Sequence, residues 1–206
     1  MGRTARRRRA VALLATTAVA GLAGCGGERA APDRPDTGWT VHRDTRHGVT
    51  VRFPSSWQRS RVSLTPHLVS PREVLSLGTF ALRRGGPSSC AHQPVGALRA
   101  AGKSDIFISL QERGSTKPLF PRRRPFVLGA ADRSEAIACV GRSVRWRSYW
   151  VQFSDAGRSF YLLAVVGDRA SRARRSQLRA VLASLRFTPS TVHHAPMASP
   201  DHERRA

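Results

Sequence analysis

The sequence predicts an α+β fold in which an antiparallel sheet is flanked by helices. Apolar and polar residues alternate from Val49 to Phe53, which is the period of a strand with one buried face. Two apolar runs, 144–153 and 160–166, enclose the turn-forming residues 154–157 and predict a β-hairpin. An apolar stripe with helical spacing predicts a helix near the C-terminal end: Leu178, Val181, Leu182 and Leu185.

The first strand is bounded by Gly48 and Pro54, which are typical of turns. Four further strands are predicted along the chain, the first two as inner strands because both of their sides are apolar: 74–82, 106–110, 126–128 and 136–139. In the first strand of the hairpin the apolar residues change parity, which indicates a β-bulge near Arg147 and Ser148.

Two helices complete the pattern. The longer one follows Ser171 and must pack its apolar stripe on the sheet. The shorter one opens at Pro94, turns Val95 and Leu98 inward, and ends near Gly102. A chain of 206 residues without internal repeats is long enough for one domain with a single core.

The N-terminus has the features of an export signal. An arginine cluster, Arg6 to Arg9, precedes an apolar run from Ala10 to Leu22. This run is shorter than the roughly 20 residues that span a bilayer, so a transmembrane helix is disfavoured. Arg8 and Arg9 also leave the twin-arginine export route open beside the general one.

Residues 22–25, Leu-Ala-Gly-Cys, resemble the lipobox of bacterial lipoproteins. This resemblance implies removal of residues 1–24 as a signal peptide and a diacylated Cys25 that anchors the protein to the membrane. A plainly secreted form stays open, because Ala18-Val19-Ala20 also has the small-x-small pattern of a cleavage site. Residues 25–37 read as a lipidated cysteine with a flexible tether, and residues 189–206 as a disordered tail.

The chain is strongly basic, with a formal charge of +22 that loss of the five signal-peptide arginines would lower by 5 to +17. Such a charge attracts phosphate-rich polymers and anionic lipids. Arginine-rich coding bias is the competing explanation, because only two of the 35 basic residues are lysines. No nucleic-acid-binding motif accompanies the charge, so we expect no nucleic-acid partner. The binding candidates are Arg122, Arg123, Arg124, Arg145, Trp146 and Arg147.

Two cysteines remain once Cys25 is assigned to lipid. In an oxidising compartment, Cys90 and Cys139 predict a disulfide that closes a loop of about 50 residues, worth about 4 kcal/mol in the chain-entropy model. Two buried thiols, or a metal site that uses Cys90 and His92, are the alternatives, but the spacing of structural zinc ligands is missing.

No constellation for catalysis is visible. The sequence lacks the Gly-x-Ser-x-Gly, phosphate-loop, His-Glu-x-x-His and EF-hand motifs. His42 and His47 lie near Asp44, where an ion pair is favoured over a metal site. Trp146, between two arginines, is either a binding residue or half-buried packing. We therefore expect no enzymatic activity, no cofactor and no metal.

A family resemblance rests on Trp39, the strand Gly48–Pro54 followed by Trp57, five or six further strands, and a closing helix that ends as 181–187. Over residues 38–188 this order resembles the PsbP-like fold, which is shared by an extrinsic photosystem II subunit, a Ran-binding nuclear import factor and many short bacterial lipoproteins. The resemblance implies an α/β/α sandwich that acts by binding or assembly, and it transfers no particular partner.

Together these observations predict a lipoprotein held through Cys25 on the extracytoplasmic face of the cell membrane. Its expected function is a non-catalytic binding or assembly module of the cell envelope. The alternative is a basic adhesion protein that binds anionic lipid or cell-wall polymer.

Overall fold

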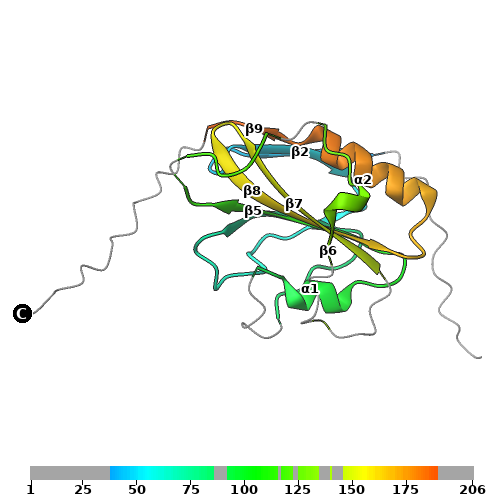
Figure 1. Cartoon of the computed structure of the whole chain (residues 1–206). Coiled ribbons are helices and arrows are strands. Elements are labelled where there is room, and N and C mark those ends of the chain that lie inside the picture. Colours follow the sequence, from blue (N-terminus) through cyan, green and yellow to red (C-terminus); the bar gives the residue numbers. More distant parts are fainter. Residues whose placement is uncertain are drawn as a thin grey trace, which may run out of the picture. The chain divides into compact units, whose positions relative to one another are not determined.

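The computed structural model describes residues 38–85, 92–115, 117–122, 125–134, 140 and 146–189. Within these residues the protein is an α+β structure dominated by antiparallel sheets, as the sequence predicts. Two sheets and two helices are arranged in layers, with the large sheet in the middle (Figure 1). Among the described residues, no helix is long and apolar enough to cross a bilayer.

The large sheet contains six strands in the order β3-β4-β5-β8-β7-β6. Their bounds are β3 Gln58–Arg59, β4 Arg72–Gly78, β5 Ile106–Arg113, β6 Arg133–Ser134, β7 Trp146–Asp155 and β8 Arg158–Gly167. The β7–β8 pair is the predicted hairpin, and its register is continuous from Trp146 opposite Gly167 to Asp155 opposite Arg158. β5 and β8 are the central strands and are almost completely buried.

The small sheet has the order β1-β2-β9, with bounds β1 Trp39–Asp44, β2 Val49–Pro54 and β9 Arg186–Phe187. β2 turns Val49, Val51 and Phe53 into the core, as its alternation predicts. Gly48 makes the tight turn before β2 with a φ of +57°, and a Cβ there would lie 2.7 Å from the carbonyl oxygen of Thr188. Glycine is therefore required at this position.

The helix α2, Arg172–Ser184, lies beside the small sheet on one face of the large sheet (Figure 1). Ser171 is its N-cap and accepts a hydrogen bond from the Arg174 amide at 3.2 Å. Its predicted stripe is buried in the main core with the inner faces of both sheets. The predicted extension of this helix to Phe187 is wrong, because the chain leaves the helix at Leu185 and Phe187 pairs with Val49 in β9.

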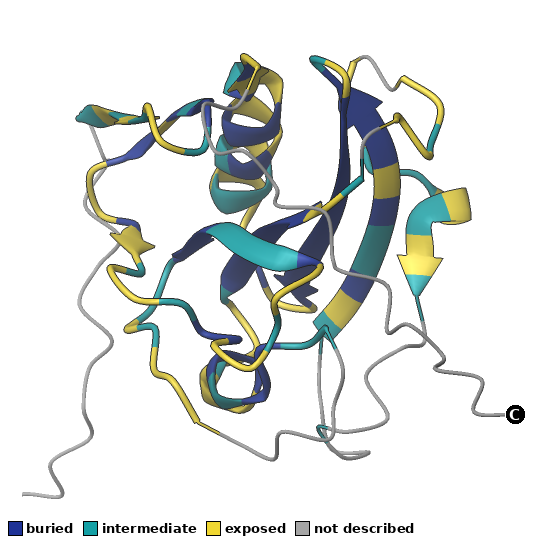
Figure 2. Ribbon diagram, turned by 90° about the vertical axis from the view of Figure 1, so that its left-hand side faces the viewer, coloured by how far each residue is buried: buried dark blue, intermediate teal, exposed yellow. Residues whose placement is uncertain are grey.

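The helix α1, Val95–Ala100, covers the opposite face of the large sheet, near the predicted bounds. Val95 and Leu98 are buried, and Leu98 joins a second apolar cluster with Phe107, Leu163 and Val165. Figure 2 shows the buried strands between these two covered faces. The large sheet thus has apolar side chains on both faces.

The β-bulge predicted in β7 is wrong, because the apolar residues of this strand pack on both faces of the large sheet. β7 contains no bulge near Arg147 and Ser148, since its pairing with β8 shows no register shift. Trp146 and Trp150 pack toward the second cluster, while Val151 and Phe153 pack in the main core. The structure instead shifts register in β4, between Glu73 and Leu75.

Two other strand predictions differ from the structure. Residues 126–128 form no strand, although Phe126 is buried edge-on against Phe153 with ring centroids 4.7 Å apart. The strand predicted over 74–82 is β4, which ends at Gly78. The strand predicted over 136–139, the signal peptide and tether, and the tail from residue 190 lie outside the described residues.

Candidate functional site

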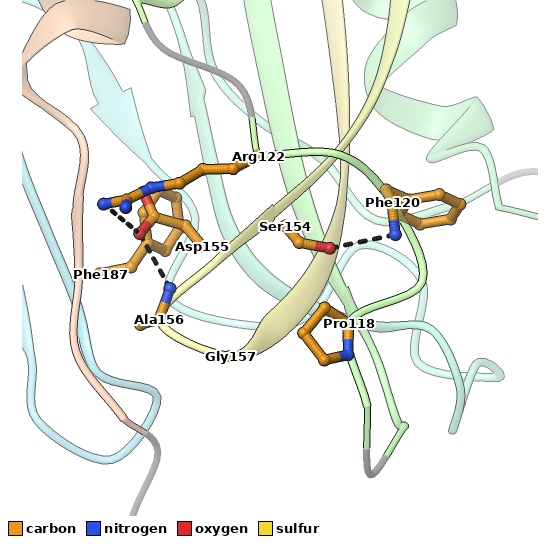
Figure 3. Close-up of a pocket in the computed structure, with 8 residues that line it drawn as sticks. All are labelled: Pro118, Phe120, Arg122, Ser154, Asp155, Ala156, Gly157 and Phe187. Atoms are coloured by element: carbon orange, nitrogen blue, oxygen red, sulfur yellow. Dashed lines mark hydrogen bonds and ion pairs between the residues drawn. The ribbon is translucent and has the colours of Figure 1, made fainter.

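A cleft of about 470 Å³ lies at the tip of the β7–β8 hairpin (Figure 3). Three segments that are distant in sequence form it: the stretch 118–122, the hairpin turn and the end of β9. The residues that line it are Pro118, Phe120, Arg122, Ser154, Asp155, Ala156, Gly157 and Phe187. The cleft is open to solvent on one side and has apolar atoms on much of its wall.

The stretch 118–122 is held on the hairpin by two buried serines. The Ser159 hydroxyl accepts a hydrogen bond from the Leu119 amide at 2.8 Å, and the Ser154 hydroxyl accepts one from the Phe120 amide at 3.1 Å. The Ser154 amide in turn donates to the Pro121 carbonyl at 3.0 Å. These hydroxyls are therefore acceptors that fix a loop, and no histidine is among the described residues that line the cleft.

The hairpin turn supplies the opposite wall. Ala156 and Gly157 both have positive φ, +50° and +76°, as a two-residue turn of this kind requires. The Asp155 carboxylate is buried and accepts a hydrogen bond from the Ala156 amide at 2.8 Å. Arg122 extends across the cleft to within 4.0 Å of this carboxylate, and its own side chain is 68% exposed (Figure 3).

Behind the hairpin, one buried carboxylate binds two arginines. Arg158 Nε donates to Glu112 Oε1 at 2.6 Å, and Arg72 Nη2 donates to Glu112 Oε2 at 2.7 Å. Burial alone would raise the pKa of Glu112, but the hydrogen bonds from Arg158 and Arg72 outweigh it and lower this pKa to about 2. Glu112 is thus a fixed anion and is unsuited to proton transfer near neutral pH.

The structure separates the predicted binding residues that it describes. Arg122 lies beside Ser154 at one end of β7, and Arg147 lies seven residues along the strand, about 23 Å away. Arg147 pairs loosely with Asp168, at 3.9 Å. Trp146 is half-buried and packs against the second cluster, as the packing alternative of the sequence analysis predicts. Arg123, Arg124 and Arg145 lie outside the described residues.

The structure describes the histidines near Asp44 but none of the three cysteines. His47 forms the expected pair with Asp44, through its backbone amide at 2.9 Å and its ring at 2.7 Å. Within the described part of the chain, no three His, Cys, Asp or Glu side chains gather as a metal site. Cys25, Cys90 and Cys139 lie outside that part.

Sequence reasoning missed most of the cleft. Asp155 was expected to serve the turn, which it does, but the arrival of Phe187 and of residues 118–122 at that turn depends on long-range pairing. The local signal in the sequence was the arginine run 122–124, which follows Pro118 and Pro121. Neither the protein-family models nor the curated proteins with which the chain was compared give a match.

Proposed function

We propose that this chain is an exported lipoprotein, anchored through Cys25, whose PsbP-like domain over residues 38–188 is a non-catalytic binding module of the cell envelope. The lipobox-like residues 22–25 support the anchor. A central sheet that is covered on one face by α2 and the small sheet and on the other by α1 is compatible with an α/β/α sandwich. We propose a disulfide between Cys90 and Cys139 as part of the same domain.

The arrangement of polar groups in the cleft supports binding rather than catalysis. Its hydroxyls and its carboxylate hold the surrounding loops, so no group in it is available as an activated nucleophile or base. What it presents outward is the apolar surface of Pro118 and Ala156 and the exposed guanidinium of Arg122. This combination suits a partner segment that carries an apolar side chain next to a carboxylate.

A charge-reversal pair tests the cleft. The mature lipoprotein, solubilised in detergent, is used to capture proteins from envelope extract, which are eluted with rising salt and identified by mass spectrometry. Arg122→Glu is compared with Arg133→Glu, a matched reversal at an exposed position of β6 outside the cleft. We expect one protein to be retained to high salt by the wild type and by Arg133→Glu, and lost with Arg122→Glu.

Two results would contradict the proposal. If both variants retain the same partner, the cleft is excluded as the binding site of that partner. Capture of polyanions alone, all released at low salt, would favour the adhesion function, because binding by charge alone weakens steeply with ionic strength.

A further inference from the structure

Acidic side chains in the described residues are bound within the fold. Each one accepts a hydrogen bond or forms an ion pair: Asp44 with His47, Glu73 with Ser76, Asp105 with Arg174, Glu112 with Arg158, Asp132 with the Gly129 amide, Asp155 with the Ala156 amide and Asp168 with Arg147. None of these contacts involves the exposed arginines of the small sheet and of α2 that are described next.

The outer face of the small sheet carries part of that charge in one cross-strand row. Arg43 of β1 lies opposite Thr50 of β2, and Thr50 lies opposite Arg186 of β9. Directly opposed residues share a face, and the neighbours of Thr50 in β2 point into the core, so this row faces outward. Arg52, two residues along β2, lies on the same face, and all three arginines are exposed.

The exposed side of α2 continues this surface. The amide and carbonyl of Arg52 both bond to the Ser184 hydroxyl, at 2.9 and 3.0 Å, so the helix end lies against β2. The Arg186 guanidinium donates to the carbonyl oxygens of Ala183 and Leu185. Arg172 and Arg179 are exposed along the helix, and α2 contains no acidic residue. Figure 1 shows α2, β2 and β9 in one layer.

We call this surface the arginine face and define it as Arg43, Arg52, Arg172, Arg179 and Arg186. No described Asp or Glu occupies α2 or an outward position of β1, β2 or β9. Apolar groups interrupt the charge: Val41, opposite Arg52, is 53% exposed, and the Arg52 guanidinium lies 5.2 Å from the centre of the Trp39 ring. Basic side chains with interspersed apolar groups and tryptophan are typical of surfaces that lie on a bilayer.

The chain connectivity also places the arginine face on the side of the domain that is joined to the proposed anchor. β1 begins at Trp39, so the segment 25–37 joins the domain at the small sheet. A flexible tether of 13 residues, as the sequence predicts, has a typical end-to-end distance of about 20 Å. An anchor at Cys25 would therefore keep this layer within reach of the lipid headgroups.

We propose that the arginine face docks on an anionic phospholipid surface and sets the orientation of the domain on its membrane. This inference rests on the lipid anchor of the proposed function. The anchor fixes the protein to the bilayer, and the face decides which side of the domain is turned toward it. Each arginine at an anionic surface contributes about fivefold to the partition between docked and undocked domain, so three contribute about a hundredfold.

The test measures orientation on the reconstituted lipoprotein. A fluorescent amino acid is placed at Ala180, an exposed position of α2, or at Ala100, an exposed position of α1 on the opposite layer. Vesicles contain phosphatidylcholine with or without one-third phosphatidylglycerol, together with headgroup spin-labelled lipid as quencher. Flotation of the vesicles reports the anchor independently of the quenching.

The charge test compares two triple variants. One is Arg43→Gln, Arg52→Gln and Arg186→Gln. The matched control is Arg61→Gln, Arg83→Gln and Arg99→Gln, which removes the same charge from exposed positions outside the arginine face. Circular dichroism and thermal unfolding confirm that each variant is folded before its quenching is read.

We expect several-fold stronger quenching at Ala180 than at Ala100 on anionic vesicles, and loss of this difference without phosphatidylglycerol, at high salt, or in the first triple variant only. Equal quenching at both positions in protein that floats with the vesicles would overturn the docking proposal and leave the anchor intact. Failure to float would overturn the anchor itself. The remaining outcome is that soluble polyphosphate changes the fluorescence of the label at Ala180, while spin-labelled lipid does not quench it. This outcome would identify an anionic polymer, and not the bilayer, as the partner of the arginine face.

Discussion

Arg158 Nε lies 2.6 Å from Glu112 Oε1, and the two side chains are 9% and 1% exposed. Arg72 binds the other oxygen of the same carboxylate, and Arg158 Nη1 donates to the Thr188 carbonyl at 2.9 Å. One buried anion thereby joins β4, β5, β8 and the chain that follows β9. The hydrogen bonds satisfy a charge whose burial would otherwise be costly.

Acid should weaken the fold through Glu112. Its pKa is about 2 in the folded protein against an ordinary 4.5, so its contribution to stability is fully present above 4.5 and is lost as pH falls from 4.5 to 2. A shift of this size corresponds to about 3 kcal/mol. Urea unfolding at a series of pH values should show the free energy of unfolding falling across this window.

The variant Glu112→Gln isolates that contribution. It should lower the free energy of unfolding at neutral pH by about 3–5 kcal/mol, because the buried Arg158 and the half-buried Arg72 lose their counter-ion, and it should flatten the acid dependence. Asp168→Asn is the control, since its ion pair with Arg147 is about half exposed and 3.9 Å long. A Glu112→Gln protein with the wild-type slope between pH 4.5 and 2 would exclude this carboxylate as the source.

The hairpin turn should be improved by substitution at Ala156. Alanine pays a conformational cost of about 1 kcal/mol at a φ of +50°, where asparagine is better tolerated. We expect Ala156→Asn to raise the free energy of unfolding by about 1 kcal/mol in chemical denaturation.

Gly157→Ala provides the opposite comparison. Its φ is +76°, and an added Cβ would meet no atom within 4 Å, so any loss is conformational and not steric. We expect a loss of about 1 kcal/mol. Equal stability of both variants and the wild type would mean that the turn does not hold these dihedral angles in solution.

The elements that could be predicted from sequence are those with local signals. The hairpin was found from Asp155 and Gly157 between two apolar runs, and α2 from a stripe with helical spacing after Ser171. The short strand β9 was missed and read as helix, because its two residues are strand only through pairing with Val49 and Thr50. Phe126 looked like a strand residue but is buried from a loop, through its ring contact with Phe153.

The candidate site was less predictable than the fold. Glu112 and Arg158 are 46 residues apart, and the sequence offers no sign that they meet. Glu112 is nevertheless the single acidic residue in β5, at the end of a buried apolar run, which marks it as a charge in need of a partner. The cleft depends on where three distant segments converge, so composition could identify Arg122 as exposed but not what lies around it.

The disulfide between Cys90 and Cys139 stays a prediction, because both cysteines lie outside the described residues. Val140, which follows Cys139, packs against the second cluster, and His92, two residues after Cys90, stacks on Tyr161 with ring centroids 5.9 Å apart. Tyr161 stacks in turn on Trp150, which packs against that cluster. We expect Cys90 and Cys139 to resist alkylation until the protein is reduced, and reduction to lower its stability by about 4 kcal/mol. Ready labelling of the unreduced native protein would exclude the bond.

Trp146 distinguishes packing from binding at a single position. Its ring packs against the second cluster, and its buried Nε1 has no hydrogen-bond partner within the described residues. Trp146→Phe removes this unpaired donor and keeps most of the apolar contact, so we expect a change in the free energy of unfolding of less than about 1 kcal/mol.

Trp146→Ala should instead cost about 2–3 kcal/mol, below the usual cost of a fully buried tryptophan because the side chain is half-buried. If Trp146 only packs, both variants retain the captured partner wherever they remain folded, as thermal unfolding would establish. If a folded Trp146→Phe protein loses the partner, the indole takes part in binding, because phenylalanine preserves the packing and removes the N–H donor.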